Sequence, residues 1–215
     1  MKNAKNKELK NLLEHASFDE RKNIWGYNCS STYENQSIEE IERKIERSGT
    51  NKFIYYLLPV KFDYLTYVRK VADKLGVVWN LEEKTENIER NIIIYIFNKK
   101  YSKLNSQKKE LLRQKYKIED YPGHSSGNGL VIYELSKSLI EMLSDEEDEF
   151  FNGIMKFMIG PAALESMGIV GLILGYLYIL RDFTFPNYKS MILTVIYIAY
   201  LRLKQSEKMG TFSGH

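Results

Sequence analysis

Two long apolar runs near the C-terminus constrain the fold of this chain more than any other feature. They cover residues 166–180 (SMGIVGLILGYLYIL) and residues 190–201 (SMILTVIYIAYL), and an arginine follows each run. Each is shorter than the roughly 20 residues that a helix needs to cross a bilayer. Both are more apolar than a helix with one face in water. The runs can be buried in the protein's own core, in a partner or in a membrane, and the sequence leaves these alternatives open.

The composition favours a helical, folded protein. Of the 215 residues 44% are hydrophobic and 27% are charged, which is ordinary for a globular chain long enough to bury a sizeable core. Only four prolines and 13 glycines interrupt the sequence. We therefore expect an all-α protein, an irregular helical bundle with a C-terminal apolar helical hairpin.

Local signals predict where several helices begin and end. Ser17 stands three residues before Glu20, and Ser37 stands three residues before Glu40. This spacing is typical of a capping box, in which the two side chains satisfy free amides at a helix start. Gly49 is placed to end the helix that Ser37 begins.

Apolar periodicity predicts the helices that follow. A short helix is expected at 53–58, and the cleanest amphipathic helix is expected at 64–75, with Gly76 as its end. From Thr85 the pattern predicts a helix that is apolar nearly all round and therefore central in the bundle. Residues 92–97 also fit a buried strand, but their flanks favour a helix.

A glycine- and serine-rich stretch, YPGHSSGNG, divides the chain. Because turn-forming residues fill it, residues 121–129 are predicted to be a linker. The prediction is an N-terminal helical domain at 1–120 and a C-terminal helical segment at 130–215 that carries the apolar hairpin.

The charge distribution argues against a nucleic-acid partner. The net charge is +3, and the excess lies after Phe150, where six basic residues accompany three acidic ones. A balanced front part lacks the basic face that nucleic-acid binding proteins show, whereas a small excess beside apolar runs fits an anionic membrane or an acidic partner. A basic patch in two successive helices is interpreted as a solvated face because Glu110 lies within it; it comprises Lys99, Lys100, Lys103, Lys108, Lys109 and Arg113.

No combination of residues predicts catalysis. His124 adjoins two serines in the linker, but a turn-rich loop does not hold the geometry that activates a nucleophile. The acidic run at 145–149 is explained by the first turn of a helix, where the helix dipole favours carboxylates. Cys29 is the single cysteine, which excludes an internal disulfide and a cysteine-based zinc site. We expect a non-enzymatic protein with no metal and no cofactor.

The candidate binding surface lies in the C-terminal part. Gly168, Gly171 and Gly175 share one helix face and allow another backbone to approach closely. Three further residues, in or beside the apolar runs, complete the candidate set for a partner or membrane surface; they are Tyr176, Tyr188 and Arg202. The N-terminus lacks the apolar core of a signal peptide, so we expect a cytoplasmic protein, peripheral to the inner membrane if the apolar surface docks there.

Four segments resemble the bacterial YaaW-like family, whose front part has been described as ubiquinol-cytochrome c chaperone-like. They are LKNLLEHASFDE, IERSGTNKFIYYLLPVKFDYLTYVRKVADKLGV, TENIERNIIIYIFNKKYSKLNSQKKELL and NYKSMILTVIYIAYLR. The resemblance implies an all-helical binding protein of antiphage defence, a sensor that binds an infection-associated phage component and recruits an effector protein encoded by a neighbouring gene. Two alternatives stay open. The chain can itself be a membrane-inserting, pore-forming effector, or it can be a chaperone for nascent membrane proteins.

Overall fold

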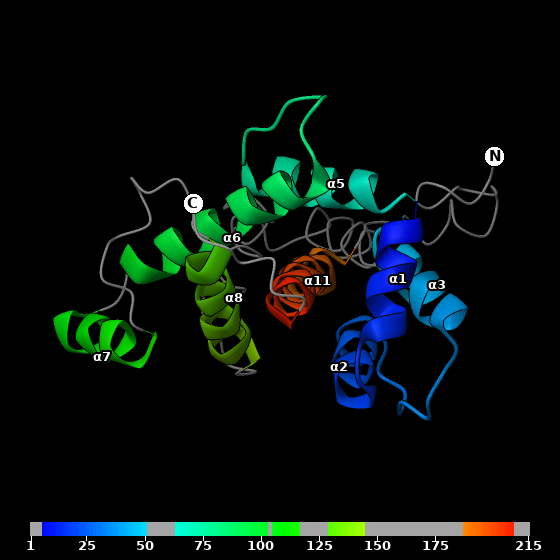
Figure 1. The fold of residues 1–215 in the computed structure, drawn as a ribbon. Coiled ribbons are helices and arrows are strands. Elements are labelled where there is room, and N and C mark those ends of the chain that lie inside the picture. Colours follow the sequence, from blue (N-terminus) through cyan, green and yellow to red (C-terminus); the bar gives the residue numbers. More distant parts are fainter. Residues whose placement is uncertain (1–5, 51–62, 103–104, 117–128, 145–186, 209–215) are drawn as a thin grey trace, which may run out of the picture.

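The computed structural model describes residues 6–50, 63–102, 105–116, 129–144 and 187–208, and within these ranges the chain is helical (Figure 1). This confirms the predicted all-α class. The described helices are α1 (Lys7–His15), α2 (Phe18–Asn28), α3 (Ile38–Ser48), α5 (Tyr64–Leu75), α6 (Thr85–Ser102), α7 (Ser106–Tyr116), α8 (Gly129–Ser144) and α11 (Tyr188–Lys208). The helix expected at 53–58, the linker up to residue 128 and the apolar run at 166–180 lie outside the described residues.

Both predicted capping boxes form. At the start of α2, Glu20 N donates to Ser17 Oγ at 3.3 Å and Ser17 N donates to Glu20 Oε2 at 2.7 Å. The same pair of bonds begins α3, where the two distances are 3.2 and 3.1 Å between Ser37 and Glu40. Each box satisfies two amides that a helix start would otherwise leave without a partner.

The two predicted stop glycines end their helices for different reasons. Gly76 has φ +76°, the left-handed conformation that glycine adopts without a steric penalty, and it ends α5. Gly49 ends α3 with φ −89°, which any residue can adopt. The position that a Cβ would take at residue 49 is instead occupied by the Tyr67 ring, because such a Cβ would lie 2.6 Å from the Tyr67 Cε2 atom. Glycine is therefore required at residue 49 by close packing.

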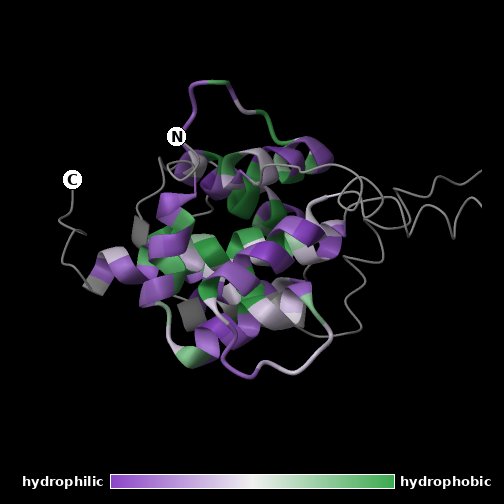
Figure 2. Ribbon diagram, turned by 90° about the vertical axis from the view of Figure 1, so that its right-hand side faces the viewer, coloured by the Kyte–Doolittle hydropathy of each residue, from purple (hydrophilic) through white to green (hydrophobic). Residues whose placement is uncertain are grey.

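Helix α11 occupies the centre of the bundle and contacts α1, α2, α3, α5, α6 and α8 (Figure 1). Every residue from Ser190 to Ala199 is buried. Figure 2 shows hydrophobic positions in green towards the centre and hydrophilic positions in purple towards the outside. Of the three alternatives for the run at 190–201, the structure shows the first, because this run is buried in the protein's own core.

Helix α6 lies beside α11 and is a helix throughout its length, which excludes the strand alternative for 92–97. Five of its apolar side chains are fully enclosed; they are Ile88, Ile92, Ile93, Ile96 and Phe97. Helix α8, which follows the predicted linker, packs against both α6 and α11. The described helices from both predicted domains thus share one hydrophobic core.

Polar bonds also fasten α11 to the N-terminal helices. They are Asn23 Nδ2 to Tyr197 Oη (2.8 Å), Asn28 Nδ2 to Thr194 Oγ1 (2.8 Å), Lys204 Nζ to Glu20 Oε1 (2.5 Å) and Gln205 Nε2 to Leu12 O (3.0 Å). Hydrogen bonds are directional, so they specify the rotation of α11 about its axis, which apolar packing alone would leave loosely defined.

Candidate functional site

The structure separates the residues of the predicted C-terminal binding surface. Gly168, Gly171, Gly175 and Tyr176 lie outside the described residues. Tyr188 is the first residue of α11 and is half-buried, and the ammonium of Lys74 lies 5.2 Å from its ring centroid. Arg202 lies near the other end of the same helix, so the structure does not bring the two described candidates together.

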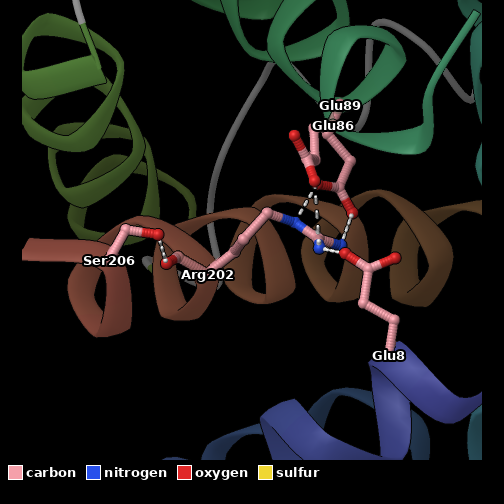
Figure 3. A network of polar contacts seen from close by, with 5 residues as sticks. All are labelled: Glu8, Glu86, Glu89, Arg202 and Ser206. Atoms are coloured by element: carbon pink, nitrogen blue, oxygen red, sulfur yellow. Dashed lines mark hydrogen bonds and ion pairs between the residues drawn. The ribbon is translucent and has the colours of Figure 1, made fainter. Parts of the chain in front are cut away.

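Arg202 is at the centre of an ionic network that is buried on the side of Glu89 and exposed at Glu8 and Glu86 (Figure 3). Its Nε donates to Glu89 Oε2 at 3.0 Å and its Nη2 donates to Glu89 Oε1 at 3.2 Å. Its Nη1 contacts the Glu8 carboxylate and lies 3.9 Å from Glu86 Oε1. Because these carboxylates come from α1 and α6, the guanidinium connects three helices.

Burial perturbs the acid–base properties of this network. The Glu89 side chain is 1% exposed and that of Arg202 is 12% exposed. Burial raises the pKa of Glu89 to about 8 and lowers the pKa of Arg202 to about 10, because both charged forms lose the stabilisation that water gives. The bidentate contact favours the ionised pair and opposes both shifts. Burial and the neighbouring Glu89 raise the pKa of Tyr64 as well.

Arg202 is expected from the sequence to contribute to a partner or membrane surface, and in the structure its side chain is 12% exposed and faces carboxylates of the same chain. Its guanidinium is occupied by internal carboxylates, and its role is to fix α11 against α6 and α1. The sequence held a signal for this role. A charged residue that is buried at the end of an apolar run needs a counter-ion, and Glu86 and Glu89 stand three residues apart on one face of the apolar helix predicted from Thr85.

The most exposed aliphatic side chains lie on the loop between α5 and α6, a feature that the sequence analysis did not single out. Among the described residues, Val78 is 89% exposed and Leu81 is 80% exposed. The loop projects from the body of the protein (Figure 1). We call residues 76–84 the α5–α6 loop and treat its tip as the candidate binding site.

Trp79 anchors the base of this loop. Its Nε1 donates to Asp73 Oδ1 at 2.7 Å, and the Arg69 guanidinium lies 4.5 Å from its ring centroid, a cation–π contact. Arg69 Nη2 also donates to the Leu81 carbonyl at 2.8 Å. Arg69 of α5 therefore contacts both the Trp79 side chain and the Leu81 carbonyl, and it fixes the loop on both sides of Asn80.

Further hydrogen bonds fix the second half of the loop. Glu82 N donates to Asn80 Oδ1 at 3.0 Å, and Asn80 N donates to Glu83 Oε2 at 3.2 Å. Asn91 Nδ2, one turn and a half into α6, donates to Glu83 Oε1 at 3.1 Å. The loop thus has a defined conformation in which two aliphatic side chains face solvent. Such an arrangement carries no reactive group and is suited to insertion into an apolar recess.

Other kinds of site receive no support within the described ranges. No three or more histidine, cysteine, aspartate or glutamate side chains there are placed to hold a metal ion. None of the helices described is both long enough and apolar enough to span a bilayer. His124 and the acidic run at 145–149 lie outside the described residues.

The chain matches no protein-family model, no curated protein and no solved structure. The resemblance to the YaaW-like family is therefore a hypothesis that rests on the four sequence segments alone.

Proposed function

We propose that this protein is a recognition protein that binds a protein partner through the α5–α6 loop. The observation that carries the proposal is the exposure of Val78 and Leu81 on a loop with a fixed conformation. Full burial of such side chains in a partner contributes about 1.5–3 kcal/mol each. A loop that is already ordered loses little conformational entropy on binding, so more of this energy is retained as affinity.

The charges around the tip favour an apolar recess in a protein over an anionic membrane. The loop contains two acidic residues and one basic residue, and Glu82, adjacent to Leu81, is exposed. A carboxylate at this position would be repelled by anionic lipid headgroups. In a protein interface it can lie at the polar rim that surrounds an apolar contact.

The biological setting that we propose is antiphage defence in the bacterial cytoplasm. The support is the resemblance to the YaaW-like family, which implies a sensor that recruits an effector encoded next door. The α5–α6 loop is then the contact for that effector. The infection-associated component that triggers the sensor is recognised elsewhere on the molecule.

The decisive experiment combines the double variant Val78→Ser/Leu81→Ser with the product of the neighbouring gene. Co-expressed wild-type protein should retain the effector through affinity purification and protect cells from some phages. The double variant should bind at least tenfold more weakly and lose protection, while its unfolding midpoint stays unchanged. Leu111→Ser, which removes another exposed aliphatic side chain, is the matched control for this contact and should retain the effector as wild type does. Equal effector binding by the double variant and wild type would refute the proposal.

A second candidate function, a membrane-inserting effector, is supported by the uncharged run at 166–180. In that case expression of this chain without any partner should dissipate the membrane potential, and deletion of 166–180 should abolish toxicity. The run at 190–201 is not part of this test because its removal would delete the core of the bundle.

A further inference from the structure

Helix α7 stands at the periphery of the bundle (Figure 1). It packs against α8, and Lys109 reaches back to the end of α6, where its Nζ lies 5.2 Å from the Tyr101 ring centroid. Leu111 on this helix is 59% exposed, and its neighbours Glu110, Arg113 and Gln114 are also exposed. Helix α7 therefore presents an aliphatic side chain and charged groups to solvent together.

The segment that contains α7 is the most basic part of the chain. Residues 99–116 include seven lysines and arginines and one acidic residue, an excess of six positive charges. The whole chain has a net charge of +3, so this segment carries twice the net charge of the molecule. The one acidic residue, Glu110, forms an exposed ion pair with Arg113, with 3.7 Å between Oε2 and Nη1. Exposed pairs are weak in water, so Arg113 remains available to an anionic partner.

We propose that α7 and the last turn of α6 form a docking surface for membranes with anionic lipid headgroups. The exposed side chains of Lys99 and Arg113 contact the headgroups, and Leu111 enters the boundary between headgroups and acyl chains. A basic helix with an exposed aliphatic residue binds such interfaces through charge attraction and apolar burial together. This surface is separate from the α5–α6 loop, and the inference does not depend on the function proposed for that loop.

Two aromatic side chains that the structure describes near the patch, Tyr95 and Tyr101, favour lipid over nucleic acid. Binding of single-stranded nucleic acid uses exposed rings on which bases stack. Tyr101 is buried and stacks on Phe97 at a centroid distance of 5.5 Å, and Lys109 lies over its ring. Lys99 similarly lies 5.5 Å from the ring centroid of Tyr95. A lysine of the protein itself lies over each of these rings. Leu111, in contrast, is exposed, and only lipid or another protein could bury it.

The order of the helices along the chain separates the docking surface from the α5–α6 loop. Helix α6 begins directly after the α5–α6 loop and ends directly before α7, so the two surfaces lie at opposite ends of it. At 1.5 Å per residue this helix is about 27 Å long. A molecule that rests on a bilayer through α7 therefore keeps Val78 and Leu81 away from the lipid and accessible to a partner.

The test uses the full-length protein and sedimentation with vesicles of phosphatidylcholine alone or with one quarter phosphatidylglycerol. We expect at least tenfold tighter binding to the phosphatidylglycerol vesicles, with most of it lost between 0.1 and 0.5 M NaCl. Lys99→Glu/Arg113→Glu should weaken binding at least tenfold. Lys7→Glu/Lys22→Glu makes the same change in net charge at exposed positions of α1 and α2 and should have little effect.

Two further measurements make the outcome decisive. Leu111→Ser leaves the charge unchanged and should weaken vesicle binding several-fold, which purely electrostatic adsorption would not show. Circular dichroism of each variant verifies that it is folded, and the salt series on wild-type protein tests the proposal without any variant. Equal binding to both kinds of vesicle would overturn the proposal, as would tight binding of a single-stranded oligonucleotide without binding to vesicles.

Discussion

Arg202 and Glu89 form a bidentate ion pair in the interior, with Nε–Oε2 and Nη2–Oε1 distances of 3.0 and 3.2 Å. The two residues are 113 positions apart, and their contact joins α11 to α6. Because α11 is the central helix, this pair influences the position of the element around which the described helices pack.

Removal of the guanidinium should strongly destabilise the protein. Arg202→Ala leaves the Glu89 carboxylate buried without its counter-ion, and breaking a buried pair in this way typically costs about 3–5 kcal/mol. Urea unfolding followed by circular dichroism measures the change. Lys10→Ala, which removes an exposed pair with Glu39, is the control and should leave the unfolding midpoint unchanged. Equal midpoints for Arg202→Ala and wild type would show that the pair does not hold α11.

Burial of Glu89 predicts a pH dependence of stability once its counter-ion is removed. Burial raises the pKa of this carboxyl above its ordinary value of 4.5, and in the wild type the bidentate contact with Arg202 opposes that shift. Folded Arg202→Ala should therefore bind the proton more tightly than its unfolded chain, so its stability is greatest below pH 4.5 and is lost as the pH rises through the raised pKa. The difference in unfolding free energy between wild type and Arg202→Ala, measured from pH 5 to 9, should widen with pH. A difference that stays constant would show that burial does not raise the pKa of Glu89 in the variant.

Two glycine substitutions should have opposite effects. In Gly49→Ala the new Cβ would lie 2.6 Å from Tyr67 Cε2, so the buried ring must shift, and overpacking of this kind costs about 1–3 kcal/mol. Gly26 lies within α2 with no atom within 4 Å of an added Cβ, so Gly26→Ala should stabilise the protein by about 0.5–1 kcal/mol. Thermal unfolding of the two variants measures the contrast. Equal shifts in both would contradict the packing role of Gly49.

The core position of the run at 190–201 can be tested at Ile196, which is 0% exposed. Ile196→Ala should lower the free energy of unfolding by about 2–5 kcal/mol, because it removes buried methyl groups and leaves a cavity. Leu111→Ala, at a position that is 59% exposed, should change it by less than about 0.5 kcal/mol. If Ile196→Ala leaves stability unchanged, the run belongs to an interface and not to the core of the bundle.

The start of α2 and the end of α5 could be predicted because the groups responsible are close in sequence. Ser17 and Glu20 satisfy each other's amides across three residues, and Gly76 adopts its left-handed conformation without help from distant residues. Helical flanks likewise predicted α6 correctly, although six consecutive apolar residues at 92–97 also fit a strand.

The candidate site was harder to predict because exposure is not a local property. Val78 and Leu81 have the same residue types as core positions, and the sequence does not distinguish them from buried neighbours. They are exposed because Arg69 and Asp73 of α5 hold Trp79 and the Leu81 carbonyl, which turns the two side chains outward. These contacts arise only once α5 and the loop have packed together.

The sequence by itself determined the helical class and the limits of helices such as α2 and α5, since capping and backbone conformation depend on residues a few positions apart. Only the tertiary structure decided that the run at 190–201 is the centre of the bundle and that Arg202 is an internal residue. An apolar run does not specify what will bury it, because the hydrophobic effect is non-directional and favours burial against any apolar surface. The partner of this run is the set of apolar side chains that α6, α8 and the N-terminal helices present to it, and the contact of Arg202 with Glu89 fixes the end of the run against α6.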